Sequence, residues 1–408
     1  MNFEYYIAKK IAPGRTETYS KPVVRIAILS IALGLALILA SVAIVIGFKH
    51  SISEKMYGFA APLQIIPFDN NQSLEESPLK IQPDFLKILG NNKKITHYQF
   101  TAQKAGVIKT RAQIQGAILK GVDSTYDFTF LKNHLISGHI PDVQSGKRSR
   151  EVLISKWLAD KLILKTGDAL RIWFIGSTPS EAMGRKLKIS GIYQTGIEAF
   201  DSRYVLGDLR QIQSLNQWQP NQVGSIELQV THPDQIDGVA EEVYHSLPYN
   251  LNIQTIYTQY PEIFNWLKLL DTNVVVILTL MILVAGITMI STLFILIIER
   301  TQMVGILKTM GVNNRSLRKI FLYKATYIIL WGMVIGNLLG MGFYWIQHQY
   351  HWFKLDAQNY YVSYVPVELH WTGIVILNIS VLILCLAMLL LPSHYLSRII
   401  PSQALRYE

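Results

Sequence analysis

The sequence TNVVVILTLMILVAGITMISTLFILII occupies residues 272–298 and contains no charged side chain. About 20 consecutive apolar residues suffice for a helix to cross the hydrocarbon core of a bilayer, where backbone polar groups must be satisfied within the segment. Three other stretches are similar, at residues 23–48, 325–346 and 371–391, and Arg25 is the only charged residue in them. The sequence therefore predicts an α-helical membrane protein with four transmembrane helices and a large domain, residues 49–271, between the first two.

The distribution of basic residues predicts the topology. The chain has 408 residues, of which 50% are hydrophobic and only 16% charged, which excludes a soluble cytoplasmic enzyme. Residues 299–324 contain six Lys and Arg against one acidic residue. Short basic segments remain in the cytoplasm, so we expect residues 1–22, 299–324 and 392–408 to be cytoplasmic and residues 49–271 and 347–370 to be extracytoplasmic. The large domain is nearly neutral, which argues against nucleic-acid binding.

The N-terminal region and the single cysteine add two expectations. Residues 1–22 are interpreted as an interfacial segment with a helix broken at Pro13-Gly14. The first apolar stretch continues past a cleavage-like sequence at Ala40–Ala43, which favours an uncleaved anchor over a signal peptide. Cys385 is the only cysteine, so no intrachain disulfide can form.

The large domain has the pattern of a mixed α/β fold. Short apolar strands and amphipathic helices predict one α/β subdomain from residues 49–120 plus 225–271, with an inserted, mainly β subdomain at 121–224. The segment Pro261–Leu270 reads as an amphipathic helix that continues into the second span without a helix breaker. We therefore expect a stiff stalk between this domain and the membrane.

Catalytic motifs are absent from the sequence. There is no G-x-x-x-x-G-K-[ST], H-E-x-x-H, C-x-x-C or G-x-S-x-G. His348 and His351 lack further metal ligands nearby, so no metal site is predicted. Turn and cap roles are expected for four aspartates: Asp123, Asp127, Asp201 and Asp208. The spans hold no ionisable residue well inside the membrane, which disfavours ion-coupled transport.

Two membrane-associated patterns are more specific. Gly332, Gly336 and Gly340 recur every four residues in the third span and predict close helix packing. The loop after the second span reads ERTQMVGILKTMG from Glu299 to Gly311. Its apolar residues share a helical face and Gly311 is a natural helix terminator. This segment either rests on lipid or docks on a cytoplasmic protein.

The pattern E-R-x-x-x-x-G-I-L-K-T-M-G, followed by a basic stretch and a new span, resembles the FtsX-like and MacB-like (type VII) ABC transporter permeases. Within that family, the chain is most similar to the lipoprotein-releasing permeases LolC and LolE. The segments that carry the likeness are Gly47–Lys49, Leu119–Asp123, Val152–Asp168, Gly191–Tyr204 and Pro401–Arg406.

The resemblance implies a non-catalytic permease subunit, with no cofactor of its own, in the inner membrane of a Gram-negative bacterium. ATP and Mg would bind a cytoplasmic ABC ATPase dimer, and a second permease copy or paralogue would complete the membrane part. The other partners implied are a lipoprotein substrate and a periplasmic carrier. Motion would pass mechanically from the ATPase through the cytoplasmic loop and the stalk to the outer domains.

The resemblance also implies roles for three groups of residues. ATPase coupling is assigned to Val304, Ile306, Leu307, Met310 and Gly311. A wall for acyl chains is assigned to Val42, Val45, Ile46, Phe48, Ile263, Trp266, Leu267 and Leu270, although ordinary packing against lipid explains these residues equally well. A carrier-binding loop, with a plain surface hairpin as the alternative, is assigned to Pro179, Met183, Gly184 and Arg185. A MacB-like efflux or peptide-export permease and an FtsX-like regulator of cell-wall hydrolases stay open as alternative functions.

Overall fold

The computed structural model describes residue 6 and residues 20–68, 76–110, 113–144, 147–174, 183–356 and 360–395. Its contacts divide the chain into two compact units. We name them the helical unit (residues 1–49, 266–354 and 364–408) and the sheet unit (residues 50–265 and 355–363). The expected interfacial helix at Pro13-Gly14 lies outside the described residues.

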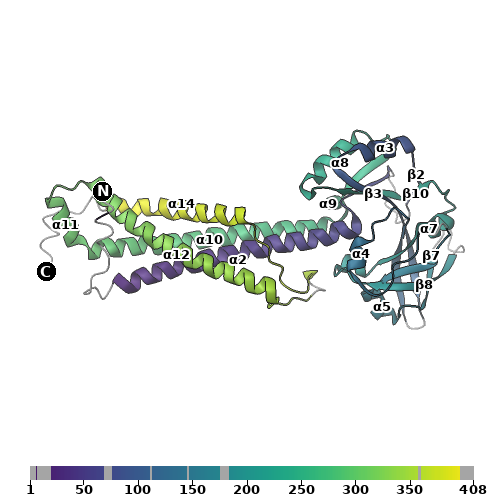
Figure 1. The fold of residues 1–408 in the computed structure, drawn as a ribbon, viewed down its shortest axis with the longest axis horizontal. Coiled ribbons are helices and arrows are strands. Elements are labelled where there is room, and N and C mark those ends of the chain that lie inside the picture. The colour runs from purple at the N-terminus through teal and green to yellow at the C-terminus, as the bar shows by residue number, and fades with distance from the viewer. Residues whose placement is uncertain are drawn as a thin grey trace. The chain divides into compact units, whose positions relative to one another are not determined.

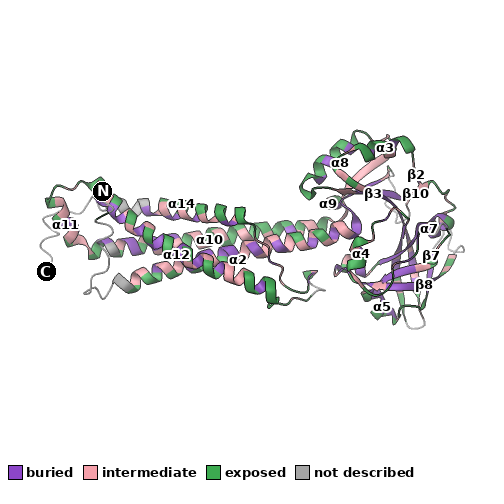
Figure 2. Cartoon of the chain, in the orientation of Figure 1, coloured by how far each residue is buried: buried purple, intermediate pink, exposed green. Residues whose placement is uncertain are grey.

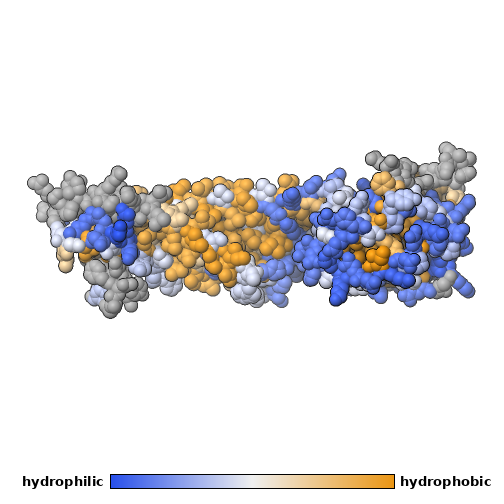
Figure 3. Space-filling view, turned by 90° about the horizontal axis from the view of Figure 1, so that it is seen from above, coloured by the Kyte–Doolittle hydropathy of each residue, from blue (hydrophilic) through white to orange (hydrophobic). Residues whose placement is uncertain are grey.

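Four long helices dominate the helical unit (Figure 1): α2 (Ser20–Ala60), α10 (Pro261–Glu299), α12 (Asn314–Tyr350) and α14 (Trp371–Tyr395). All four are long and apolar enough to be candidate membrane spans. Figure 3 shows their surface as a continuous hydrophobic band, whereas hydrophilic residues cover most of the visible face of the sheet unit. The unbroken helix predicted from Pro261 through the second span is confirmed by α10.

The helix α2 continues well beyond the predicted end of the first span at Phe48. Its last two turns contain Ile52, Met56 and Phe59, all at most 1% exposed. Their spacing of four and three residues places them on one helical face that the sheet unit buries. The sequence reading missed this extension because the polar residues between them end the apolar run. The structure thus places residues 49–60 in a helix that the predicted boundary cut in two.

The glycine repeat of α12 packs against α2. A Cβ atom added to Gly332, Gly336 or Gly340 would lie 2.8 Å from atoms of Ile31, Ala32 or Leu39. The absence of side chains at these three positions therefore lets the two helices approach closely, as small residues do in membrane helix pairs. A second link joins α12 to α14, where the amides of Asn337 and Asn378 donate to each other's oxygens at 2.7 and 3.0 Å.

The sheet unit is built on ten strands of one mixed sheet. Eight of its pairings are antiparallel, and β4–β9 and β6–β8 are parallel. The strands are β1 (Leu63–Pro67), β3 (Ile95–Lys109), β4 (Ile114–Val122), β5 (Leu135–Gly138), β6 (Glu151–Ser155), β7 (Ala169–Phe174), β8 (Met183–Tyr193), β9 (Tyr204–Asp208), β11 (Ser225–Val230) and β12 (Leu251–Thr255). A separate two-stranded sheet pairs β2 (Leu79–Lys80) with β10 (Gln222–Val223).

Short helices complete the unit. They are α3 (Pro83–Asn91), α4 (Thr129–Asn133), α5 (Lys156–Leu162), α6 (Glu198–Asp201), α7 (Leu209–Asn216), α8 (Ile236–Tyr244) after the 3-10 turn η1 (Pro233–Gln235), and α9 (Ile256–Gln259). Strand β12 ends at Thr255, which caps α9 by accepting a hydrogen bond from the Thr258 amide. Figure 2 shows buried residues along the strands and more exposed ones on α3 and α8.

The two parts predicted for the large domain, residues 49–120 plus 225–271 and residues 121–224, contribute strands to opposite ends of the sheet. Strands from residues 49–122 and 225–255 form one end of the sheet, in the order β12-β1-β11-β3-β4. Strands from residues 135–208 form the other end, in the order β9-β6-β8-β5, with β7 off this path. The inserted part contains the helices α4 to α7 as well as strands, and it shares one hydrogen-bonded sheet and one hydrophobic core with the rest of the unit instead of forming a subdomain of its own.

A buried ion pair lies inside the sheet unit. Lys120 on β4 and Glu227 on β11 are each about 2% exposed, and their charged atoms are 2.7 Å apart. The Lys120 ammonium also donates to the Phe59 carbonyl at the end of α2, and the Gln99 amide donates to the Glu227 carboxylate. A buried charge is tolerated only when it is paired and hydrogen-bonded, as these are. The pair therefore attaches the last turn of α2 to the middle of the sheet.

Candidate functional site

The loop between α10 and α12 forms a short helix with a well-defined end. Helix α11 (Thr301–Thr309) is followed by Gly311 with φ of +88°. The Gly311 amide donates to the Lys308 carbonyl and the Val312 amide donates to the Leu307 carbonyl, both at 3.0 Å. This is the double hydrogen bond that closes helices at a left-handed glycine. The structure therefore confirms Gly311 as the terminator, and Asn313 begins α12 directly afterwards by accepting a hydrogen bond from the Ser316 amide.

The residues assigned to ATPase coupling do not all face outward. Val304 is fully buried in the hydrophobic cluster of the helical unit, and Leu307 packs against that cluster. Ile306 and Met310 are 50% and 75% exposed. Val304 is therefore a correction: it attaches α11 to the long helices and cannot contact a docking protein. The exposed large apolar side chains at this end of the loop helix are Ile306 of α11 and Met310 directly after it.

The residues assigned to an acyl-chain wall also divide by burial. On α2, Val42, Val45, Ile46 and Phe48 are half-buried. On α10, Trp266 and Leu270 are half-buried, whereas Ile263 and Leu267 are only 6% and 3% exposed. Ile263 and Leu267 are thus corrections, since they are already covered by their own chain. Between the two helices, the Lys49 ammonium and the Asp271 carboxylate form an exposed ion pair at 2.8 Å.

The predicted carrier-binding loop is shorter than expected. Met183, Gly184 and Arg185 belong to strand β8, where they pair with Phe174, Trp173 and Ile172 of β7. The six-membered ring of Trp173 lies close to Gly184, since a Cβ added there would be 3.0 Å from it. Met183, Gly184 and Arg185 are therefore corrections, because they lie in a strand and not in the connection between β7 and β8, whose residues 175–182 are outside the described part of the chain. Pro179 lies outside the described residues.

The strands beside this connection present a cationic surface. Arg171 of β7 lies directly opposite Lys186 of β8, and Lys188 follows two residues later on the same face. All three are exposed, as is Trp173 at 42%. Like charges directly opposite each other destabilise a strand pair. Their juxtaposition on an exposed face is therefore unfavourable for the fold alone and suits a negatively charged partner.

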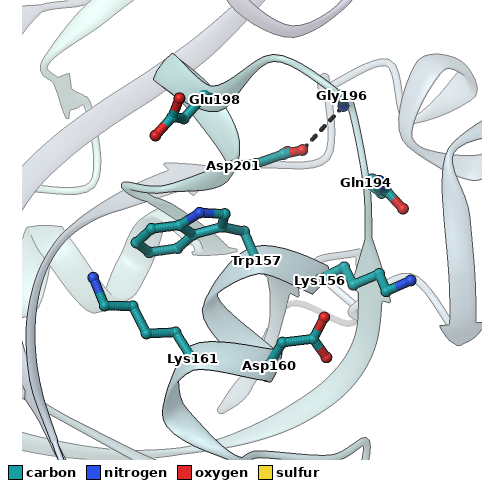
Figure 4. A pocket seen from close by; sticks show the side chains of 8 residues that line it. All are labelled: Lys156, Trp157, Asp160, Lys161, Gln194, Gly196, Glu198 and Asp201. Atoms are coloured by element: carbon teal, nitrogen blue, oxygen red, sulfur yellow. Dashed lines mark hydrogen bonds between the residues drawn. The ribbon is translucent and has the colours of Figure 1, made fainter. Parts of the chain in front are cut away.

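A recess of about 540 Å³ lies between α5 and the segment after β8 (Figure 4). Its lining residues are Lys156, Trp157, Asp160, Lys161, Gln194, Gly196, Glu198 and Asp201. The Lys161 ammonium lies 4.3 Å from the centroid of the Trp157 ring, and the Asp201 carboxylate accepts hydrogen bonds from Thr195 and Gly196. The Lys161 ammonium and the Asp201 carboxylate are therefore engaged by neighbouring groups of the same unit.

The four aspartates have the turn and cap roles expected of them. Asp123 and Asp127 accept hydrogen bonds from the amide and hydroxyl of the threonine two residues later, and Asp208 caps α7 and pairs with Arg210. Burial raises the pKa of Asp201, which the surrounding donors counteract. Among the described residues no group of three His, Cys, Asp or Glu side chains is placed to hold a metal ion. His348 and His351 lie against the rings of Tyr344 and Tyr364.

Comparisons with known families decide what this arrangement belongs to. Residues 26–245 match the MacB-like periplasmic core domain, and residues 275–401 match the FtsX-like permease C-terminal domain. The chain belongs to the FtsX-like and MacB-like permease family. It is a permease of an ABC transporter, with candidate membrane-spanning helices and a mixed α/β domain of the MacB type.

Curated relatives of this permease align over nearly its whole length. The chain is 21% identical to the lipoprotein-releasing system transmembrane protein LolE of Haemophilus influenzae, over 99% of each chain. It is also 21% identical to LolC of Xylella fastidiosa, over 93% of each chain. Among solved structures, it is similar to the periplasmic region of MacB from Actinobacillus actinomycetemcomitans, with a TM-score of 0.36 and 14% identity over 52% of this chain and 98% of that one.

The sequence reading missed the polar network around Lys120 and Glu227. Both strands carried a usable signal, because ILKGV at 118–122 and SIELQV at 225–230 each place one charge within an apolar strand. A charge at a buried strand position requires a partner of opposite charge, and Lys120 and Glu227 are partners of each other. The close approach of residues 366 and 367 to Gly47 was also missed, since only the folded chain brings them together.

Proposed function

We propose that this permease extracts lipoproteins from the inner membrane of a Gram-negative bacterium and passes them to a periplasmic carrier. The observation that carries the proposal is the alignment with lipoprotein-releasing relatives over 93–99% of the chain, including both the helical and the sheet unit. The described residues offer no metal cluster for chemistry of the chain's own. A separate ATPase dimer that binds ATP and Mg supplies the energy.

Coupling to that ATPase is assigned to the exposed end of α11. Ile306 and Met310 present exposed apolar side chains, and the basic residues Lys308 and Arg315 are close to them in the sequence. The glycine-terminated end of α11 and the cap at Asn313 fix the helix between α10 and α12. A displacement of α11 is therefore passed to the two helices on either side of it, because the connections are only a few residues long.

Lipoprotein acyl chains are assigned to the half-buried apolar residues of α2 and α10. Val42, Val45, Ile46 and Phe48 on α2 and Trp266 and Leu270 on α10 retain surface that a lipid chain can cover. A second permease copy or a paralogue supplies the opposite wall. The side chains suit any saturated chain, so the protein part of the substrate must be recognised elsewhere.

The carrier is assigned to the connection 175–182 and the cationic surface beside it. Arg171, Lys186 and Lys188 attract an acidic partner, and Trp173 adds an exposed aromatic ring of the kind that anchors protein interfaces. Replacing both Lys186 and Lys188 by Glu should slow carrier association and weaken its salt dependence, while leaving ATPase binding unchanged.

Reconstitution tests the proposed function. The permease, co-purified with its ATPase, is placed in proteoliposomes with an acylated lipoprotein and a soluble carrier, and ATP-dependent transfer to the carrier is measured. Photo-crosslinkers at Phe48 and Trp266 should capture the acylated protein. Capture of phospholipid alone, together with no ATP-dependent transfer, would refute lipoprotein release.

The MacB-like alternative rests on the match of residues 26–245 to the MacB-like periplasmic core. ATP hydrolysis in the same proteoliposomes distinguishes the two functions. A soluble peptide or a small hydrophobic compound should stimulate ATP hydrolysis if the permease is an efflux or peptide-export protein. A lipoprotein-releasing permease responds to the acylated protein and loses the response when the acyl chains are removed.

A further inference from the structure

A group of exposed aromatic side chains surrounds the connection between α12 and α14. We name it the aromatic surface, and it lies within residues 343–354 and 364–371. Six of its large side chains are between 42% and 75% exposed: Trp345, Tyr350, Trp352, Phe353, Tyr364 and Trp371. These side chains lie in and between two candidate membrane spans, α12 and α14, where exposed aromatic rings suit the interface of a bilayer.

The rings of the aromatic surface touch one another. Trp345 and Tyr350 are 6.0 Å apart between centroids, and Trp352 and Phe353 are 6.2 Å apart. Phe353 in turn lies 6.1 Å from Phe343. These contacts join five of the rings into two groups, Trp345 with Tyr350, and Phe353 with Trp352 and Phe343.

The backbone beneath these rings is held in one conformation. Gln347 is only 1% exposed, and its amide nitrogen donates to the carbonyls of Val365 and Phe353. Its oxygen accepts a hydrogen bond from the Phe353 amide at 3.0 Å, and the Val365 amide donates to the Phe353 carbonyl at 2.9 Å. The buried Gln347 side chain thus hydrogen-bonds the backbone on both sides of the connection, at Phe353 and Val365. These hydrogen bonds preorganise the connection.

The same connection is fastened to α2. The Glu368 amide donates to the Ala43 carbonyl at 3.0 Å. A Cβ on Gly47 would lie 2.6 Å from the carbonyl of Pro366, so only glycine leaves room for this contact. The aromatic surface is therefore continuous with three candidate spans: α2, α12 and α14.

The charge of the aromatic surface indicates what covers it. Its two segments contain one lysine, Lys354, and one carboxylate, Glu368, so they carry one group of each charge. Glu368 lies 3.5 Å from His370. Trp and Tyr rings prefer the headgroup layer of a bilayer, and the exposed Lys354 ammonium beside them suits a lipid phosphate.

We propose that the aromatic surface is a preformed binding site for phospholipid headgroups, which seats the α12–α14 connection in the outer leaflet and fixes the outer end of α2 at that depth. Because α2 also carries the proposed acyl-chain residues, the site sets the depth at which the permease meets its substrate. Lipid binding here does not depend on what the substrate is, so it stands or falls separately from lipoprotein release.

Depth-dependent quenching tests this site in the full-length protein. Cys385→Ser removes the single cysteine, and Trp371→Cys then carries an environment-sensitive fluorophore in phosphatidylethanolamine and phosphatidylglycerol liposomes. We expect quenching by headgroup spin-labelled lipid to exceed quenching by mid-chain spin-labelled lipid several-fold. Tyr249→Cys, which replaces a side chain 98% exposed in the sheet unit, is the aqueous control and should respond to iodide alone.

A matched pair of variants ties the effect to the aromatic rings. Trp352→Ser with Phe353→Ser should reduce the headgroup quenching at position 371 several-fold, whereas Trp352→Tyr with Phe353→Tyr should retain it. Iodide quenching at position 371 equal to that at position 249 would overturn the proposal in favour of an exposed loop. Protection from both iodide and lipid quenchers would overturn it in favour of a protein partner.

Discussion

At the residue scale, Glu76 is a carboxyl group whose environment favours its neutral form. Its carboxylate accepts a hydrogen bond from the backbone N–H of Gln103 at 2.7 Å. Gln103 lies two residues beyond Thr101, the last residue of β3 that pairs with β11. Burial raises the pKa of Glu76 from its usual 4.5 to about 8, and the nearby Glu227 carboxylate adds to the rise. The folded protein therefore holds a proton that the unfolded chain releases above pH 4.5.

This shift makes a prediction about pH. Between pH 4.5 and 8 the folded state binds more protons than the unfolded state, so stability of the sheet unit should fall as pH rises, by at most about 1.4 kcal/mol per pH unit. Glu76→Gln keeps an acceptor for Gln103 without a charge and should remove the loss. Hydrogen exchange of residues 76–80 and 222–223 in the full-length protein at pH 6 and pH 8 measures it. An identical pH response in both proteins would contradict the assignment.

Gly336 of α12 gives a second prediction at the residue scale, because it packs closely against α2. A Cβ there would lie 2.8 Å from the Ala32 carbonyl oxygen and 2.9 Å from Leu35, and the backbone of α2 cannot yield easily. Gly336→Ile should therefore lower stability by about 1–3 kcal/mol, as overpacking does, and should lower the melting temperature in detergent. Gly342→Ala is the control, because nothing lies within 4 Å of that position. Equal melting temperatures for the two variants would show that the helices are not in close contact.

At the scale of elements, one side of α11 is exposed and available for docking, and the other is buried in the fold. Ile306 is half exposed, whereas Val304 is fully buried in the helical unit. Ile306→Asp should abolish co-purification of the ATPase while expression persists, because an unpaired charge in an apolar contact costs several kcal/mol. Thr309→Asp places the same charge at an exposed polar position of α11 and should retain binding. Normal ATPase binding by Ile306→Asp would show that the helix only rests on lipid.

The elements also show what can be read from sequence. The apolar spans, the strand at 151–155 and the cap at Asp208 follow from local patterns, and the structure has them. Which face of a helix becomes buried cannot be read in the same way, because it depends on residues distant in the chain. Val304 of α11 and Ile263 and Leu267 of α10 are examples, since the folded chain buries all three. Likewise, no local pattern reveals that Gly47 faces Pro366 or that Lys120 meets Glu227 across β3.

At the scale of the whole molecule, the topology can be tested with two exposed positions. Tyr249 in the sheet unit is 98% exposed and Met310 after α11 is 75% exposed. In a Cys385→Ser background, an impermeant thiol reagent should label Tyr249→Cys from the periplasmic side and Met310→Cys only after the inner membrane is opened. The reverse pattern would invert the predicted orientation.

The helix α10 has residues in both units, and force passing between them depends on its stiffness. Replacing Leu269 and Leu270 by Gly costs about 2 kcal/mol of helix propensity relative to Ala, which introduces a flexible point without changing chain length. Leu269→Gly with Leu270→Gly should therefore retain ATP hydrolysis and lose most ATP-dependent release, whereas Leu269→Ala with Leu270→Ala removes the same side chains and should release substrate far better. The measurement is the ratio of lipoprotein released to ATP hydrolysed in proteoliposomes. If the Gly and Ala pairs give the same ratio, the side chains rather than the stiffness of α10 carry the coupling, and mechanical transmission through this helix is wrong.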